Sequence, residues 1–498
     1  MTKLHYVGAT PDETTIDKLD HALFVLPCTT DRPTRKTWRS LPYGALLEQR
    51  FAQRGGKKDA PFVTELPNPR GTRVVVAVAN AKGTAFDRLS LARKLSAACL
   101  QAQPRRVDIV VGAGAATVQQ DFAEALALAL LVANHQLPDF KSEATTRKAL
   151  AAITVRGVRS TGSTRTVLTE AEANNLARTL ISLPPNELNP ATYRRRAQAL
   201  ARQNGWSFRF YNKAALRRLG AGAFLAVAQG SEDNTAGIVR LSYRPRGQEA
   251  SSRPRLALVG KGICFDTGGN NLKPARHMHG MHEDMGGSAV ALATLLALSQ
   301  RKVDYGVDCW LALSENHIGP KAYKPNDVVK ACNGKTIEVI HTDAEGRMVL
   351  ADTLALACRQ SPSLVIDYAT LTGACIYALG TAYTGAFTNR EALQPVLIAA
   401  GRDSGERVWP FPLDSDYDQA LESKVADIKQ CTLEGEADHI LAARFLSRFV
   451  DESSAWIHLD LAACNHKGGL AHVPTDVTGF GVRFSLELLG RANVFDHL

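Results

Sequence analysis

Two segments decide the fold of this chain. Residues 259–274 read VGKGICFDTGGNNLKP and are followed by EDMGG at 283–287, and residues 341–347 read HTDAEGR. They bring four carboxylates and three cationic side chains next to apolar runs: Lys261, Asp266, Lys273, Asp284, Asp343, Glu345 and Arg347. Isolated buried charge is costly, so these groups must pair with one another or bind metal. Oxygen ligands suit hard or borderline divalent ions, and two adjacent ions form a hydrolytic centre that activates water.

The surrounding pattern places these charges at the ends of strands. A helix is predicted over Gly346–Arg359, because Leu350, Leu354 and Cys358 recur four apart on one face. Tight turns are expected after the first strand, at Gly260, Gly262, Gly268 and Gly269. At least five strands are predicted: Leu256–Val259, Gly306–Leu313, Thr336–Ile340, Leu364–Tyr368 and Ala455–Leu461. Open α/β sheets place their sites beyond the carboxyl ends of strands, which is where these charges fall.

The first 160 residues show a separate βαβ pattern. Its predicted strands and helices are Arg73–Val78, Phe86–Gln103, Val107–Val111, Val118–Gln136 and Ala152–Val155, which indicate a parallel or mixed sheet. Gly112 and Gly114 follow a strand, as in a dinucleotide-binding fingerprint. The third glycine and the acidic ribose partner are missing, so we favour a plain tight turn.

A helix is expected to connect two domains. It is predicted over Thr169–Leu183, with a capping-box pattern at its start, and Asn189–Pro190 opens the next helix. Tyr243–Arg255 is rich in Arg, Pro, Gly and Ser and predicts an exposed loop. The predicted fold is therefore α/β. A smaller N-terminal α/β domain (1–160) is joined by a connecting helix and linker (161–185) to a larger catalytic α/β domain with a central mixed sheet (186–498).

Composition narrows the class of protein. The chain has 498 residues, of which 45% are hydrophobic and 22% charged, as in ordinary globular proteins. Nine cysteines without CxxC pairs predict reduced thiols and a cytoplasmic location. The N-terminus lacks the apolar stretch of a secretory signal. The longest apolar run, Phe122–Ala133, contains Glu124 and is too short to span a bilayer, so no membrane association is expected.

A net charge of +10 admits nucleic-acid binding as an alternative function. The arginines are dispersed, the aromatic fraction is only 7%, and the sequence suggests no helix-turn-helix. A solvated basic surface is the simpler interpretation.

The polar segments resemble the signature of the leucyl (cytosol) aminopeptidase family, dinuclear metallopeptidases that remove N-terminal residues from peptides. The resemblance covers about the C-terminal two thirds of the chain, from Leu183 onward. Asp343–Arg347 matches the core motif of the family, and Lys261, Asp266, Lys273 and Asp284 have its spacing. Further matches are Glu315–Asn316, Tyr323–Pro325, Asp327–Val328 and Ala369–Ala374.

This resemblance implies a role for each residue. It implies two divalent ions per subunit (zinc, manganese or magnesium) held by Lys261, Asp266, Asp284, Asp343 and Glu345. Lys273 would stabilise the tetrahedral intermediate, and Arg347 would bind a bicarbonate that acts as base. Residues that would contact the substrate, with a leucine-like preference, are Met281, Thr370, Leu371 and Gly373. A homohexamer acting on peptide substrates is also implied.

The order of residues at 343–347 gives a further expectation about the segment that carries Asp343 and Glu345. Asp343, Glu345 and Arg347 alternate, so we expect an extended turn that points them to the same side. Helix-dipole compensation would explain the two acids alone, but not together with Asp266 and Asp284.

The nearby histidines and one cysteine receive structural roles. The spacing of His277, His279 and His282 fits no closed zinc site, so we expect them in solvent or loop packing. Among them, His282 lies two residues from Asp284 and is the one most open to another role. Cys264 is expected in the core.

The sequence departs from the family pattern in three places. These departures concern the substrate pocket and the general base, and they leave the expected metal ligands unchanged. His341 stands where the family usually has Asn, Thr267 replaces Ser, and Glu436–His439 replaces a Gly- and Ala-rich stretch. A catalytically inactive homologue is disfavoured because every ligand position is filled.

Overall fold

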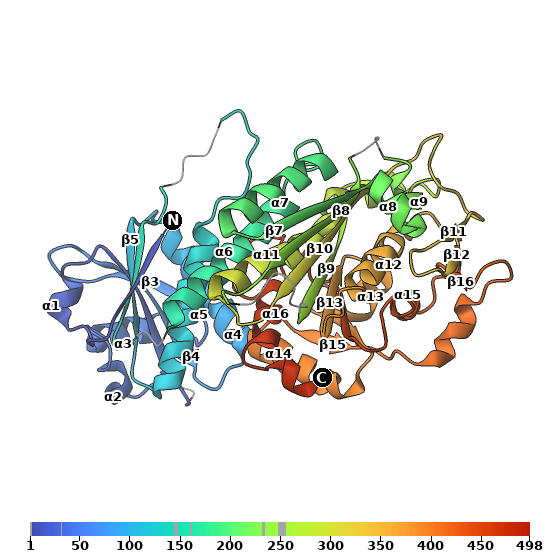
Figure 1. The fold of residues 1–498 in the computed structure, drawn as a ribbon. Coiled ribbons are helices and arrows are strands. Elements are labelled where there is room, and N and C mark those ends of the chain that lie inside the picture. Colours follow the sequence, from blue (N-terminus) through green and yellow to red (C-terminus); the bar gives the residue numbers. More distant parts are fainter. Residues whose placement is uncertain (1, 31, 144–147, 160–161, 232–234, 248–254) are drawn as a thin grey trace. The chain divides into compact units, whose positions relative to one another are not determined.

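The computed structural model describes residues 2–30, 32–143, 148–159, 162–231, 235–247 and 255–498. By contacts the chain divides into two compact units (Figure 1). The first comprises Met1–Asn175, Arg402–Gly405 and Lys467–Thr478, and the second Leu176–Gly401, Glu406–His466 and Gly479–Leu498. The α/β class predicted from the sequence is confirmed in both.

The first unit contains a six-stranded sheet in the order β1-β6-β5-β2-β4-β3. All neighbours are parallel except β3 and β4. Gly112 and Gly114 lie in the short connection between the end of β5 at Val111 and the start of α5 at Ala116, which agrees with the interpretation of a strand-to-helix turn. The bounds of the elements are β1 Lys3–Val7, α1 Glu13–Ile16, β2 His21–Cys28, α2 Arg35–Trp38, α3 Gly44–Gln53, β3 Phe62–Glu65, β4 Arg73–Asn80, α4 Ala85–Leu100, β5 Arg106–Val111, α5 Ala116–Asn134 and β6 Ala152–Arg156.

Helix α5 is the most apolar element of this unit. By length and composition it is long enough to cross a membrane, and it extends beyond the apolar run recognised in the sequence. Over half of its most apolar window is buried, and residues 122–132 join α4 and the sheet in one core cluster. Packing inside the unit thus accounts for its hydrophobicity.

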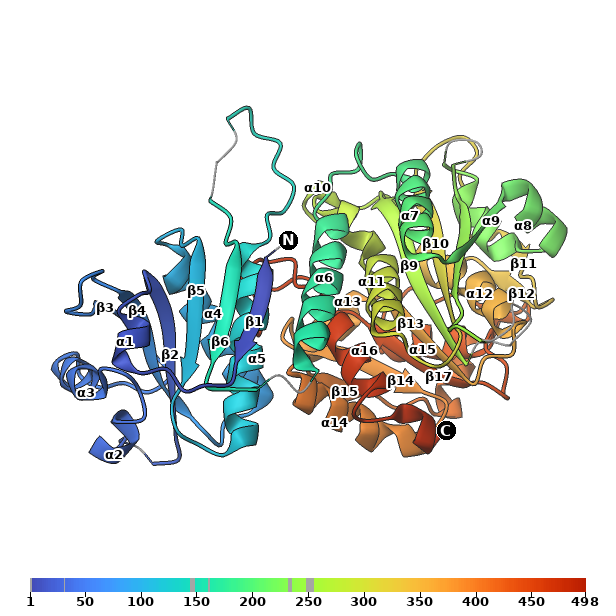
Figure 2. The ribbon, with the colours of Figure 1, turned by 60° about the vertical axis from the view of Figure 1, so that its left-hand side comes forward.

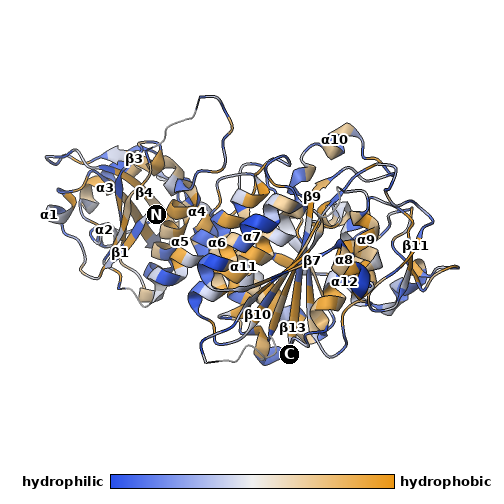
Figure 3. Ribbon diagram, turned by 45° about the horizontal axis from the view of Figure 1, so that its top comes forward, coloured by the Kyte–Doolittle hydropathy of each residue, from blue (hydrophilic) through white to orange (hydrophobic). Residues whose placement is uncertain are grey.

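The second unit is built on an eight-stranded mixed sheet in the order β15-β14-β17-β13-β9-β10-β8-β7 (Figure 1). The central strands β17, β13, β9 and β10 are mutually parallel, whereas β7, β8 and β14 pair antiparallel with a neighbour. Much of β10 and β13 is hydrophobic (Figure 3) and nearly all of their residues are buried, as in strands covered on both faces. The strands are β7 Ser207–Asn212, β8 Gly237–Tyr243, β9 Leu256–Asp266, β10 Val307–Asn316, β13 Leu364–Ala369, β14 Thr384–Thr388, β15 Val408–Pro410 and β17 Ala455–Asp460.

Helices cover both faces of this sheet, and Figure 2 shows α11 beside β9 and β13. A Cβ at Gly260 would meet α11 at Ser288, whereas the next side chain, Lys261, lies against α12 at Gly346. Successive strand residues point to opposite faces, so α11 and α12 lie on opposite sides of β9. The helices that lie wholly or partly in the second unit are α6 Ser163–Ile181, α7 Pro190–Asn204, α8 Lys213–Leu219, α9 Gly222–Ala228, α10 Ala275–Met278, α11 Gly286–Arg301, α12 Glu345–Cys358, α13 Gly373–Leu379, α14 Gln394–Ser404, α15 Asp438–Ser447 and α16 Val482–Leu489. Four short 3₁₀ segments are η1 Met281–Met285, η2 Glu391–Leu393, η3 Ser415–Leu421 and η4 Val494–His497.

Strand β9 differs from its prediction. It continues through Gly260 and Gly262 to Asp266, so these glycines lie in the strand and only Gly268 and Gly269 form the turn, with φ of +86° and +65°. The register against β10 shifts between Ser314 and Asn316, which is a β-bulge. Because the extra residue changes the phase of alternation, Lys261 and Asp266 face the same side although five residues separate them.

Two other predicted elements also differ. Helix α6 begins at Ser163, so the predicted capping box at Thr169 is wrong, and the Thr169 hydroxyl instead donates to Thr166 O within the helix. Asn189 caps α7 as predicted. Thr336–Ile340 does not join the central sheet: β12 (Thr336–Glu338) pairs with β11 (Val328–Lys330) and β16 (Ile428–Lys429). Most of the predicted 243–255 loop lies outside the described residues.

A substitution at Gly287 tests the close packing of α11. A Cβ there would lie 2.0 Å from Tyr368 O, so Gly287→Ala must push α11 away from β13. We expect a loss of at least about 1–3 kcal/mol in the free energy of unfolding. Gly319→Ala is the control, because nothing lies within 4 Å of its added Cβ. Equal stability of the two variants in denaturant titrations would contradict this packing.

Candidate metal centre

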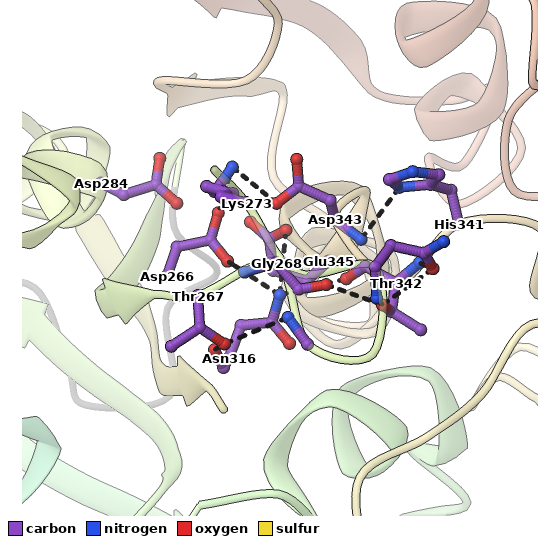
Figure 4. A network of polar contacts seen from close by, with 12 residues as sticks. Asp266, Thr267, Gly268, Lys273, Asp284, Asn316, His341, Thr342, Asp343 and Glu345 are labelled. Atoms are coloured by element: carbon purple, nitrogen blue, oxygen red, sulfur yellow. Dashed lines mark hydrogen bonds and ion pairs between the residues drawn. The ribbon is translucent and has the colours of Figure 1, made fainter. Parts of the chain in front are cut away.

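The predicted metal residues converge near the carboxyl end of β9, where Asp266, Asp284, Asp343 and Glu345 lie close together (Figure 4), although Lys261 lies within the strand and not beyond its end as predicted. Strand β9 provides Lys261 and Asp266, and the 3₁₀ segment η1 provides Asp284. Glu345 is the first residue of α12, and Asp343 lies just before it. Segments far apart in the sequence therefore supply one site, as the strand-end rule predicts.

Three carboxylates form the centre of this site. Asp266, Asp343 and Glu345 each offer an oxygen within 4.8 Å of the other two, a spacing that suits a shared metal ion. The Nζ atom of Lys273 lies 2.9 Å from Asp266 Oδ2 and 2.5 Å from Asp343 Oδ1. In the absence of metal, this ammonium group compensates part of the negative charge.

Lys261 connects the fourth carboxylate to the cluster. Its Nζ atom lies 2.7 Å from Asp284 Oδ2 and 2.9 Å from Glu345 Oε1, and it donates to Thr370 O at 3.0 Å. The side chain is almost fully buried. A buried lysine between two carboxylates occupies the position at which a cation is needed.

The electrostatics of the site favour further positive charge. Burial, together with Glu345 and Asp266, raises the pKa of Asp343 to about 7 against the opposing effect of Lys273. Burial also raises the pKa values of Asp284 and Glu345. When all four carboxylates are ionised, the two ammonium groups leave two negative charges uncompensated, which is why burial and mutual repulsion disfavour full ionisation without further cations. The donor set of carboxylate oxygens and one potential amine thus fits divalent ions.

The predicted extended turn at 343–347 is wrong. Glu345 and Arg347 lie in the first turn of α12, where successive side chains rotate around the helix instead of alternating. Arg347 is nearly fully buried; its Nη1 donates to Gln430 O at 3.1 Å and its Nη2 to Asp438 Oδ1 at 2.7 Å. Both terminal nitrogens thus bind protein oxygens outside the carboxylate cluster.

A hydrogen-bond network connects the segment around Asp266 and Gly268 with Asn316 and Thr342. Asn316 Nδ2 donates to Asp266 Oδ1 at 2.8 Å and to Thr342 O at 3.0 Å, and Gly268 N donates to Asp266 Oδ1 at 2.9 Å (Figure 4). The Tyr323 hydroxyl also donates to Thr342 O, at 2.6 Å. The sequence marked Asn316 and Tyr323 as family matches without a role. It gave no signal for Thr342 as their shared acceptor.

A cavity of about 1020 Å³ opens over the cluster. All eleven predicted residues line it: Lys261, Asp266, Lys273, Met281, Asp284, Asp343, Glu345, Arg347, Thr370, Leu371 and Gly373. Sequence reasoning missed Asp460, which ends β17, lines the cavity, and accepts hydrogen bonds from Leu371 N, Thr372 N and Thr372 Oγ1. The strand-end rule could have found it, because it closes a predicted strand.

The histidines are not part of the carboxylate group. His277 and His279 are exposed, His282 is partly buried, and none belongs to the cluster of Asp266, Asp343 and Glu345. His341 lines the cavity and its Nδ1 accepts from Asp343 N at 3.2 Å, while Cys264 is buried as expected. All nine cysteines are free thiols.

Comparison with known proteins decides the family. The profile of the cytosol aminopeptidase family, catalytic domain, matches residues 175–486. The chain belongs to the cytosol aminopeptidase family. A probable cytosol aminopeptidase of Methylorubrum extorquens is 36% identical over 90% of this chain and 88% of its own length. A relative of the same description from Prochlorococcus marinus is 40% identical, and the match spans 64% of each protein.

Solved structures agree with this membership. A mutant of tomato leucine aminopeptidase superposes with a TM-score of 0.85 at 27% identity, covering 99% of this chain and 97% of that one. The bottromycin maturation enzyme BotP in complex with Mn gives a TM-score of 0.80 at 32% identity, with 94% and 98% covered. The predicted family and fold are confirmed, and the nucleic-acid alternative finds no support.

Replacing the histidines near the cluster tests the composition of the metal site. We expect His277→Ala and His279→Ala each to leave metal stoichiometry unchanged, because both side chains are exposed and outside the carboxylate group. Elemental analysis of the purified variants measures this, with Asp266→Asn as the variant expected to lose metal. Loss of one equivalent of metal in either histidine variant would overturn the assignment.

Proposed function

We propose that this chain is a metal-dependent aminopeptidase that hydrolyses the N-terminal residue from peptides. The observation that carries the proposal is the buried group of Asp266, Asp343 and Glu345, joined to Asp284 through Lys261, in a cavity large enough for a peptide end. Membership in the cytosol aminopeptidase family supports the same reaction.

Two divalent ions would be held by Lys261, Asp266, Asp284, Asp343 and Glu345. The mixed nitrogen and oxygen donors accept zinc, manganese or magnesium. When bound, the ions would polarise the carbonyl group of the substrate and lower the pKa of the attacking water. The protein contributes the fixed orientation of the carboxylates, which Asn316 and the Gly268 amide hold in place.

Lys261 must lose a proton to act as a ligand, because an ammonium group has no lone pair. Burial disfavours its charge, but the carboxylates of Asp284, Glu345 and Asp266 outweigh burial and raise its pKa in the metal-free protein. Metal binding at this position therefore competes with a proton and strengthens as the pH rises.

Lys273 would act as an electrophile rather than a ligand. Its ammonium group sits between Asp266 and Asp343 at the edge of the cluster. Burial opposes the charge, yet Asp266, Glu345 and Asp343 together raise the pKa of Lys273, so it stays cationic. A fixed cation there stabilises negative charge developing on the carbonyl oxygen of the substrate.

The first residue of the substrate would occupy the part of the cavity near η1 and the start of α13. Met281, Thr370, Leu371 and Gly373 line it, which suits an apolar side chain of leucine size. Asp460 would hold the 371–372 segment by its hydrogen bonds.

Several broader properties belong to the same proposal. They are a homohexameric assembly, a cytoplasmic location, and domains at 1–160 and 186–498 joined by a helix and linker. Carbonate beside Arg347 is a further candidate; both terminal nitrogens of that arginine already bind Gln430 and Asp438.

Metal removal tests the proposed function. Dialysis against a strong chelator should abolish release of leucine from leucyl amides, and zinc, manganese or magnesium should restore it. Circular dichroism of the stripped protein controls for unfolding. Full turnover by protein shown by elemental analysis to be metal-free would exclude the mechanism.

Exchange of Lys261 tests the unusual ligand. Lys261→Arg introduces a group that stays protonated, so we expect about one metal equivalent per subunit at neutral pH instead of two. The wild type should lose one ion first on acidification, because protonation of Lys261 displaces it. The matched control is Lys324→Arg, an exposed lysine outside the cavity. Two ions bound with unchanged affinity in Lys261→Arg would show that Lys261 is not a ligand.

A further inference from the structure

Attack of water on an amide requires a group that accepts the water proton. The four carboxylates of the metal cluster are paired with Lys261 and Lys273 and would be committed to the metal ions. Lys261 would likewise be committed to a metal ion, and the Lys273 Nζ atom is already paired with Asp266 and Asp343. If the chain itself supplies the acceptor, it must be one of the remaining ionisable groups that line the cavity.

Two of the other carboxylates have their oxygens occupied. Asp460 is buried and accepts three hydrogen bonds, from Leu371 N, Thr372 N and Thr372 Oγ1. Both oxygens of Glu283 accept from Asn465 Nδ2, at 3.3 and 3.0 Å, at an exposed part of the wall. Neither carboxylate presents a free oxygen to the cavity as Asp438 does.

The histidines and cysteines of the wall are also poor acceptors. His277 Nε2 already accepts from Arg276 Nε at 3.0 Å, and His341 Nδ1 accepts from Asp343 N. In a neutral imidazole the second nitrogen then carries the proton and donates. Burial raises the pKa of the Cys431 thiol, and that of Cys464 to about 12, so both stay protonated.

Asp438 is the acid that remains. It is the first residue of α15, lines the cavity, and has a side chain 26% exposed. Its Oδ1 accepts from Arg347 Nη2 at 2.7 Å, whereas its Oδ2 makes no hydrogen bond with any described residue. The preceding Ala437 has φ of +51°, a conformation that costs energy for a residue with a Cβ and fixes where the chain enters the helix.

Arg347, the partner of Asp438, is connected through Gln430 to the segment of residues 341–344. Gln430 O accepts from Arg347 Nη1, and the side chain of Gln430 donates to Ala344 O and accepts from His341 N. Arg347 is thus held between Gln430 and Asp438 directly behind the segment that carries Asp343. This arrangement keeps the Asp438 carboxylate at a fixed position relative to the cluster.

We propose that Asp438 is the general base of the hydrolysis, a carboxylate supplied by the chain itself. The inference rests on the proposed aminopeptidase function. As the water oxygen bonds to the carbonyl carbon, the carbonyl π pair moves to its oxygen and a water proton passes to Asp438 Oδ2. When the C–N bond breaks, Asp438 returns this proton to the departing amine nitrogen. Arg347 is a positioning residue, because its charge-assisted hydrogen bond to Asp438 Oδ1 holds the carboxylate in place.

Kinetics of Asp438 variants test the proposal. We expect Asp438→Asn and Asp438→Gly to lower kcat by about 10²–10³-fold, the range for loss of a general base. KM and the number of bound metal ions should stay within about twofold, because no ligand is removed. Glu436→Gln is the control: it changes an exposed acid two residues away that does not line the cavity.

Chemical rescue separates catalysis from a structural role, such as neutralising Arg347 or the start of α15. Formate or acetate should restore part of the lost kcat in Asp438→Gly, saturably, and should leave Asp438→Asn and the wild type unchanged. Asp438→Glu should retain metal and melting temperature, so that its kcat reports geometry alone.

Three results would overturn the assignment. They are a kcat of Asp438→Asn within threefold of wild type, a loss of metal that accounts for the lost rate, or a wild type whose rate depends on added bicarbonate to the same extent as Asp438→Gly. The last result would make carbonate the base. Failure of the proposed function is distinguishable, because the wild type would then show no chelator-sensitive release of N-terminal residues.

Discussion

Compensation of buried negative charge governs this structure. Four carboxylates gather beyond the ends of two central strands, and three of them lie within 4.8 Å of one another. Such a cluster is unstable without cations, because burial and mutual repulsion both oppose ionisation. Lys261 and Lys273 supply part of the charge through ion pairs of 2.5–2.9 Å. The remaining negative charge is what suits this group of carboxylates to divalent cations.

The backbone of β9 determines how the charges meet. Close packing of α11 excludes any side chain at Gly260, so the strand can hold Lys261 against α12 on its other face. The bulge opposite Ser314–Asn316 then changes the alternation and brings Asp266 to the same side. Positive φ angles at Gly268 and Gly269 turn the chain back so that Lys273 approaches the cluster from above the strand end.

The Arg347–Asp438 pair extends the same principle away from the metal. A buried guanidinium needs an acceptor, and here it has a backbone carbonyl on one nitrogen and a carboxylate on the other. The pairing places an additional acid, Asp438, in the wall of the cavity. The contact between Arg347 and Asp438 thus gives the buried guanidinium its acceptor and also holds in place the carboxylate that we propose as the general base.

The sequence by itself indicated the α/β class, the location of the site near strand ends, and eleven of the residues that line the cavity. It could do so because charge next to apolar runs is costly and therefore informative, and because strand and helix periodicity are local properties. Only the tertiary structure decided the length and bulge of β9, the helical position of Arg347, and the contacts of Asp438 and Asp460. These depend on partners such as Gln430, 83 residues from Arg347 along the chain, and no local pattern encodes a contact at that separation.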